Sequence, residues 1–273
     1  MKVAIIDLDS LCFAIGNPNK VLDDNGQPLR IDNKFVYEDK TLEQLSDSAD
    51  FFMNKILTNS KCDAYIAYIK GKNTIANKRL IDPNYKADRN KEQPKWWEFV
   101  KGYLIENWGA IEVNNCEVDD YCVIARNQIE NSFIICIDSD IIGLEGTTFN
   151  WKKNDLVGEW VTTTAEQAEY KFWSDMITGT HNNTKGIPGK GIKFVEKLFK
   201  PVQIGETWIQ TLKHADVLNC YIEYYKDFNI ALTEYYKNYK MLYIPTKLEG
   251  FIIPEPIKYK KQEKLSEEKG IFD

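Results

Sequence analysis

The chain has 273 residues, of which 43% are apolar, and its formal net charge is −6 at pH 7. This length is enough for one sizeable core, or for one domain with an appended lobe. No run of about 18 apolar residues occurs, so no membrane span is expected. The first apolar run meets an acid at Asp7, whereas a secretory signal stays apolar for longer, so the sequence predicts a cytosolic protein. The six cysteines are scattered without a C-x-x-C motif, which favours buried free thiols over a zinc site or disulfides.

The first half of the chain alternates short apolar runs with amphipathic ones. Helical patterns begin at Thr41, near Pro94 and after Glu117, and Thr41 with Gln44 has the spacing of a capping box. The apolar runs predict buried strands at VAIID (3–7), AYIAYI (64–69), GAIEV (109–113) and FIICID (133–138). Strands that alternate with helices predict an α/β fold with a parallel sheet.

The pattern changes after the stretch 147–162, which predicts a hairpin. Thr164 and Gln167 form a second capping-box pair, and mostly helical segments follow, interrupted by a glycine-rich loop before a helix near Gly191. We therefore predict three parts, namely an α/β domain over 1–163, a helical lobe over 164–250, and a charged tail over 251–273 that is extended or partly disordered.

Carboxylates follow three of the predicted buried strands. Because ligands bind beyond the carboxyl ends of parallel strands, these side chains are expected to meet in one crevice. Hard oxygen ligands suit Mg²⁺ or Mn²⁺, and a cation would offset the repulsion between the acids. The alternative for any single acid is a structural helix cap. The seven carboxylates in these positions, and the predicted metal ligands, are Asp7, Asp9, Glu117, Asp119, Asp120, Asp138 and Asp140.

Two segments are basic although the whole chain is acidic. Residues 70–101 carry nine Lys or Arg against four Asp or Glu, and 185–200 carry five Lys against one Glu. The positive charges of Arg79 and its basic neighbours are suited to binding a phosphodiester group, and the Tyr85 ring is suited to stacking on a base at the end of the strand. The alternative is a solvated loop with Tyr85 anchored in the core.

The second basic segment contains the loop KGIPGKG. Its glycines allow close backbone approach to an anion at a helix start, and its lysines add charge without base specificity. This pattern predicts a grip on duplex DNA backbone by Lys185, Gly186, Gly189, Lys190, Gly191 and Lys193. A plain helix–turn–helix corner is the alternative, and a Walker A motif is excluded by the spacing.

The motifs IDLDS, DPNYKADR, CEVDDYC, CIDSDI and GIPGKGIKFVEKLF stand in an order that resembles the 5′→3′ exonuclease and flap endonuclease family. The similarity is greatest to the short, stand-alone phage exonucleases and covers roughly residues 1–240. The resemblance implies a PIN-like α/β domain with a helix–three-turn–helix lobe. It also implies that the six acids other than Asp9 bind metal, whereas Asp9 matches an acid in only some phage members and ranks lower. It further implies that Lys86 and Arg89 face the scissile phosphate, and that the glycine loop holds a monovalent cation such as K⁺.

The sequence departs from the family pattern just before the glycine loop. The family has G-D-x-x-D-N, whose acids help to complete a second metal site, whereas this chain has GTHNNTKG. Thr180 or a gap stands for the first acid, and Asn182 or Asn183 stands for the second. An Asn offers only a neutral oxygen to a metal, and His181 suits softer ions. We therefore expect one firm metal site and a weaker second one.

These observations support a metal-dependent 5′→3′ exonuclease that cleaves duplex or flapped DNA, and also the RNA strand of hybrids. The alternative is a nuclease-derived, structure-specific DNA-binding protein that cleaves poorly because the acids at 180–183 are missing. An RNA-cutting PIN-type toxin ranks below both because of the chain length and the glycine loop. The resemblance to phage enzymes implies action in the cytoplasm of an infected bacterium, in degrading host DNA or removing primers. The sequence does not rank exonuclease against flap cleavage, and it gives no sign of oligomeric state.

Overall fold

The computed structural model describes residues 1–87, 93–154, 156–180, 184–198, 214–245 and 251–260, and the backbone of 202–204 and 207–209. Its centre is a mainly parallel sheet with the strand order β10-β9-β8-β1-β6-β13, in which β7 also pairs with β6. The strands are β1 (Val3–Asp7), β6 (Ala64–Lys70), β7 (Ile111–Val113), β8 (Ser132–Ile135), β9 (Gly146–Asn150), β10 (Glu159–Thr163) and β13 (Ile257–Lys258).

Strand β1 lies in the middle of the sheet and is parallel to both of its neighbours. Val3 lies opposite Ala64 of β6 and Ser132 of β8, and the pairing with β6 continues to the last residue of β1, Asp7, which lies opposite Tyr68. All five residues of β1 are buried, as expected for a parallel strand covered on both faces. The carboxyl ends of these three strands therefore meet at one edge of the sheet.

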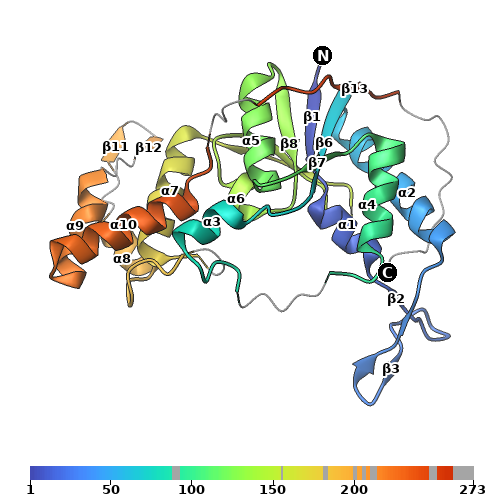
Figure 1. Cartoon of the computed structure of the whole chain (residues 1–273), viewed down its shortest axis with the longest axis horizontal. Coiled ribbons are helices and arrows are strands. Elements are labelled where there is room, and N and C mark those ends of the chain that lie inside the picture. The colour runs from blue at the N-terminus through green and yellow to red at the C-terminus, as the bar shows by residue number, and fades with distance from the viewer. Residues whose placement is uncertain are drawn as a thin grey trace.

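Helices cover both faces of the sheet (Figure 1). Ile6 of β1 belongs to a core that includes Phe52 and Met53 of α2, whereas the preceding residue, Ile5, belongs to a second core with Cys122 and Val123 of α5. This alternation follows the two-residue period of a strand. The helices of this domain are α1 (Asp9–Gly16), α2 (Leu42–Ser60), α3 (Ala76–Ile81), α4 (Trp97–Trp108), α5 (Val118–Gln128) and α6 (Ser139–Ile142).

A helical lobe lies at one end of the molecule, on the left in Figure 1. It has its own core, which includes Met176, Val195, Tyr221 and Tyr235. The buried Tyr221 hydroxyl donates to the Met176 carbonyl at 2.5 Å and accepts from Asn238 Nδ2 at 2.8 Å, which ties three segments of the lobe together. Its helices are α7 (Ala165–Thr178), α8 (Ile192–Leu198), α9 (His214–Tyr225) and α10 (Phe228–Leu242).

Both capping boxes are present as predicted. Thr41 accepts from the Gln44 backbone at the start of α2, and Thr164 does the same with Gln167 at the start of α7. The predicted hairpin is the antiparallel pair β9–β10. The strand predicted from 109 begins only at 111, because Gly109 has a φ of 62° and ends α4 in the left-handed conformation.

Other described elements were not predicted from the sequence. The charged tail predicted from 251 is described as far as 260, and here it returns to the sheet, where β13 pairs antiparallel with β6 and Tyr259 shares a hydrogen bond with Thr58 at 2.9 Å. None of the described helices is long and apolar enough to span a membrane. Short strand pairs are formed by β2 (Asn19–Lys20) with β5 (Tyr37–Glu38), β3 (Arg30–Ile31) with β4 (Lys34–Phe35), and β11 (Val202–Ile204) with β12 (Thr207–Ile209).

Candidate active site

The first two acids of the site are fixed by the end of the central strand. Asp7 closes β1, and its Oδ1 accepts a hydrogen bond from the Asp9 backbone at 2.9 Å. Asp9 in turn accepts from the Lys70 backbone, at the end of β6, at 2.8 Å. Asp9 therefore joins two neighbouring strand ends, which gives it a structural role that the sequence did not show.

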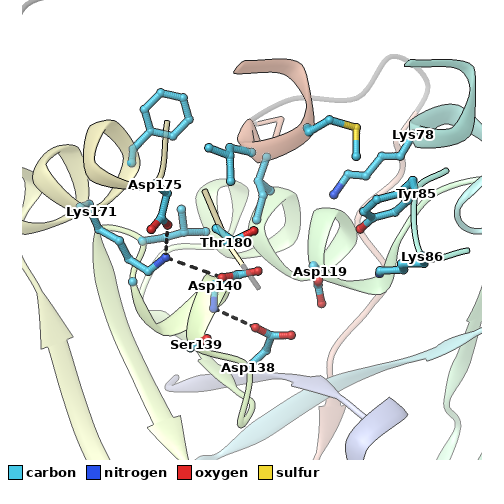
Figure 2. Close-up of a pocket in the computed structure, with 17 residues that line it drawn as sticks. Lys78, Tyr85, Lys86, Asp119, Asp138, Ser139, Asp140, Lys171, Asp175 and Thr180 are labelled. Carbon is cyan, nitrogen blue, oxygen red and sulfur yellow. Dashed lines mark hydrogen bonds and ion pairs between the residues drawn. The ribbon is translucent and has the colours of Figure 1, made fainter. Parts of the chain in front are cut away.

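The neighbouring strand β8 leads to two further acids. Asp138 caps α6, and its Oδ1 accepts from the Asp140 backbone at 2.8 Å. Because β8 lies directly beside β1, Asp138 comes close to Asp7 and its charge acts on that carboxyl. The second oxygen of Asp138 points into the pocket shown in Figure 2.

The start of α5 provides the third group of acids. Asp119 lines the same pocket, and Asp120 is buried with 7% of its surface exposed. Asp120 Oδ2 accepts from Cys116 Sγ at 3.1 Å, whereas its Oδ1 is buried without a hydrogen-bond partner in the described structure. The prediction that acids from three segments converge at this edge of the sheet agrees with this geometry.

The central acids repel one another strongly. Burial raises the pKa of Asp7 well above its usual range, and the charges of Asp9, Asp119 and Asp138 raise it further. Burial, followed by the charges of Asp138 and Glu117, raises the pKa of Asp119 to about 8. Burial also raises the pKa of Asp9 to about 6. For Asp7 and Asp119 the neighbouring acids add to the effect of burial, so their surroundings would favour a cation, whereas for Asp9 the nearby lysines oppose the effect of burial.

The donor atoms of these side chains are of the kind that binds a divalent cation, but they are not arranged as a complete metal site. Within the described chain, no group of three or more His, Cys, Asp or Glu side chains is already arranged to hold a metal ion. The donors are nevertheless hard carboxylate oxygens that lie close together, Asp7 and Asp120 are buried, and one Asp120 oxygen has no hydrogen-bond partner among the described residues. Hard oxygen donors of this kind suit Mg²⁺ or Mn²⁺.

Glu117 is surrounded by cations of the protein itself. Lys78 forms an ion pair with its Oε2, Lys86 lies 2.5 Å from its Oε1, and the Tyr85 hydroxyl donates to it at 3.2 Å. Burial alone would raise the pKa of Glu117, but the two lysines outweigh it, and the pKa is lowered. The predicted metal ligand is therefore already neutralised by ammonium groups in this structure.

The basic segment is built differently from its prediction. Tyr85 is only 3% exposed, so its ring cannot stack on an end base as predicted, and it instead orients Glu117. Arg79 is exposed, and its Nε donates to the Tyr85 carbonyl at 3.2 Å. Lys86 lines the pocket as expected, beside Lys78, which the sequence placed in the basic segment without a specific role. Arg89 lies outside the described residues.

The lobe adds charged groups to the pocket that the sequence did not predict. Lys171 and Asp175, on α7, line the cavity of about 320 Å³ together with Asp119, Asp138 and Asp140 (Figure 2). Lys171 Nζ lies 2.6 Å from Asp175 Oδ2 and 3.6 Å from Asp140 Oδ1. A Lys–Asp pair four residues apart on a predicted helix was visible in the sequence, but its position against the strand ends was not.

The loop between α7 and α8 separates into a closed part and an open part. Gly186 has a φ of 58°, and a Cβ there would meet the Gly179 nitrogen at 2.2 Å, so this glycine closes the loop. Gly189 has a φ of 76° and Gly191 has open space around it, so backbone approach is free there. Of the predicted DNA-binding lysines, Lys185 and Lys193 are exposed, and Lys190 Nζ lies 4.0 Å from the Phe194 ring centre.

Of the residues expected at the second metal site, only Thr180 lies within the described chain. It lines the pocket at the position predicted for the first missing acid. His181 and the tentative ligands Asn182 and Asn183 lie outside the described residues.

Comparison with solved structures identifies the fold. No protein-family model and no curated protein matches the chain. The chain matches the bacteriophage T5 flap endonuclease in complex with DNA and metal ions, with 13% identity, 90% of each chain covered and a TM-score of 0.54. It also matches the T5 5′-exonuclease with bound zinc, with 13% identity, 89% of each chain covered and a TM-score of 0.58.

The chain has the fold of the T5 5′-exonuclease. A third structure, the T5 protein co-crystallised with metal ions, has 12% identity over 90% of each chain and a TM-score of 0.58. The predicted fold class, a PIN-like domain with a parallel sheet and a helical lobe, is thereby confirmed. Identity this low establishes the fold alone, so the chemistry must be argued from this chain's own residues.

Proposed function

We propose that this protein is a divalent-metal-dependent nuclease that hydrolyses phosphodiester bonds at the 5′ ends of duplex or flapped DNA. The observation that carries the proposal is the meeting of crowded carboxylates with the lysines of the basic segment in one pocket, next to the buried Asp7. Neither feature alone requires a phosphate substrate, but together they suit an anion that is held beside a cation.

The central carboxylates are the proposed metal ligands. Asp7, Asp119 and Asp138 offer oxygens from β1, α5 and the end of β8, and Asp120 lies behind them with one buried oxygen unpartnered in the described structure. When bound, Mg²⁺ or Mn²⁺ would supply Lewis-acid polarisation of a phosphoryl oxygen and a more acidic water. Asp9 holds the ends of β1 and β6 together and so positions Asp7.

Lys78 and Lys86 are the proposed substrate-binding groups of the pocket. Lys78 and Lys86 present ammonium groups beside the acids, where they can donate to a phosphate oxygen and offset the charge that develops during cleavage. Glu117, with help from Tyr85, holds both ammonium groups at this position. Arg89, outside the described residues, belongs to the same proposed group through the family resemblance.

The lobe supplies the proposed grip on the duplex. Lys185 and Lys193 are exposed on either side of the open glycines 189 and 191, and Lys190 lies between them. Contacts of this kind fix DNA by its backbone and carry no sequence information. The family resemblance further suggests K⁺ at this loop, so activity should be compared in KCl and NaCl.

The test is cleavage of 5′-labelled duplex and 5′-flap DNA by the purified protein with Mg²⁺ or Mn²⁺. Release of short 5′ products, abolished by a chelator and by Asp138→Asn, would support the proposal, and the product length would separate exonuclease from flap cleavage. Binding of flap DNA without cleavage in either metal would instead establish the alternative, a structure-specific DNA-binding protein. An RNA–DNA hybrid tested in parallel checks the proposed activity on RNA. The proposed place of action is the cytoplasm of an infected bacterium.

A further inference from the structure

Among the described residues of the lobe, Lys171 is the one cation that lines the pocket. Its Nζ lies 2.6 Å from Asp175 Oδ2 on the same helix and 3.6 Å from Asp140 Oδ1. Asp140 belongs to α6 at the end of β8, so this contact joins the lobe to the sheet domain (Figure 2). The arrangement is therefore more than a pair on one helix surface.

The carboxylates at this edge of the sheet differ in whether a cation of the protein is paired with them. In the described structure Asp7, Asp119 and Asp138 have no ion pair within 4.0 Å, whereas Asp140 and Asp175 share Lys171. The central acids are therefore available to an external cation, whereas the two outer acids already have an internal one. An ammonium group this close to two carboxylates repels any further cation at the same place.

We propose that Lys171 is a built-in counter-ion that takes the place of a second divalent cation and limits this site to one. This inference rests on the proposed function, because it assumes that the central acids bind the first ion. In a site with two divalent ions about 4 Å apart, each needs its own carboxylate oxygens. Here the outer pair is held by an ammonium group, and the nearby loop contributes the neutral Thr180 to the pocket.

The proposal predicts how many ions the protein binds. Lys171→Ala removes the ammonium group that lies between Asp140 and Asp175, and with it the charge that repels a second divalent ion there. Lys171→Met does the same while keeping an apolar stem of similar length, and Lys171→Arg keeps the positive charge. Because the Lys171 side chain is 35% exposed, none of these changes opens a buried cavity.

A matched control is available elsewhere in the lobe. Lys237 pairs with Asp82 at 3.0 Å, with side-chain exposures of 33% and 19%, close to the 35% and 20% of Lys171 and Asp175. Neither Lys237 nor Asp82 lines the pocket. Lys237→Ala therefore removes an equivalent ion pair without touching the proposed metal site.

The experiment is a titration of the full-length protein with Mn²⁺, without DNA, followed by electron paramagnetic resonance and calorimetry. We expect one saturable binding step for the wild type, Lys171→Arg and Lys237→Ala, and two for Lys171→Ala and Lys171→Met. Circular dichroism and melting temperatures of each variant without metal show whether it is folded.

Each outcome decides the inference. Two binding steps in the wild type, or a single step in folded Lys171→Ala and Lys171→Met proteins, would overturn it while leaving the proposed nuclease function intact. No Mn²⁺ binding by the wild type, together with no DNA cleavage, would overturn the proposed function and the inference with it. Gain of a second step in Lys237→Ala would show that loss of any lysine suffices, and would also overturn it.

Discussion

The carboxylates at the centre of the site and those at its two flanks lie in different electrostatic surroundings. In the centre, the buried Asp7 and the half-buried Asp119 lie beside other acids, and their pKa values are raised. On the flanks, Glu117 is paired with lysines of the basic segment, and Asp175 is paired with Lys171. If the proposed function holds, the central carboxylates are the ones available to an external cation.

The largest expected effect separates a central acid from a flanking one. Asp119→Asn should lower cleavage of 5′-flap DNA by about 100- to 1000-fold, because lost metal ligation removes several kcal/mol of transition-state stabilisation. Asp175→Asn should lower it less than about tenfold, because Lys171 remains beside Asp140. Single-turnover rates at saturating Mg²⁺ measure both, and equal losses would erase the distinction between centre and flank.

The next effect concerns the flank formed by Glu117. Lys86→Ala should lower kcat by about 100-fold, as for loss of one donor to the developing charge, while Lys78 still neutralises Glu117. The double variant Lys78→Ala with Lys86→Ala leaves a carboxylate that is 6% exposed without either lysine, which should cost about 3–5 kcal/mol of stability. Urea unfolding measures the second effect, and an unchanged stability would show that Glu117 does not depend on these lysines.

A smaller effect is expected at the surface of the lobe, where the proposed role of the lysines is DNA binding and not the chemical step. Lys185→Ala with Lys193→Ala should weaken DNA binding and reduce the slope of log affinity against log salt by about 2, with the single-turnover rate at saturation unchanged. Lys152→Ala with Lys153→Ala, in the exposed hairpin turn, is the control. Fluorescence anisotropy over a range of salt concentrations gives the slope, and an altered saturating rate would place these lysines in the chemical step instead.

The smallest effect is on the stability of the metal-free protein. The folded-state pKa values of Asp7 and Asp119 are raised, the latter to about 8, so the native state binds more protons than the unfolded state between pH 4 and 8. Stability should therefore fall as pH rises through this window. We expect a melting temperature at least about 3 °C lower at pH 8 than at pH 5, since each kcal/mol is worth about 2–4 °C at this size.

Two comparisons sharpen this pH experiment. Added Mg²⁺ should restore the melting temperature at pH 8, because it offsets the charge that the central acids acquire. Asp7→Asn should flatten the pH dependence, since one of the crowded charges is removed, whereas Asp175→Asn should leave most of it. A melting temperature that rises from pH 5 to pH 8 without metal would contradict the account of the central acids.

Much of the fold could be predicted because its signals are local. Short apolar runs mark the buried strands, and an acid at the end of such a run marks a site residue, as in VAIID and Asp7. Thr41 and Thr164 mark helix starts through contacts only three residues long. The tail strand β13 could not be predicted, because its pairing with β6 joins residues nearly two hundred positions apart.

The sequence by itself determined that acids would gather at one edge of a parallel sheet, since parallel strands bring their carboxyl ends together. It also determined that neutral residues replace acids before the glycine loop. Only the tertiary structure decided which of these charges are neutralised from within. Lys78 meets Glu117, and Lys171 meets Asp140, through the packing of separate elements, and no local pattern encodes the distance between side chains on different elements.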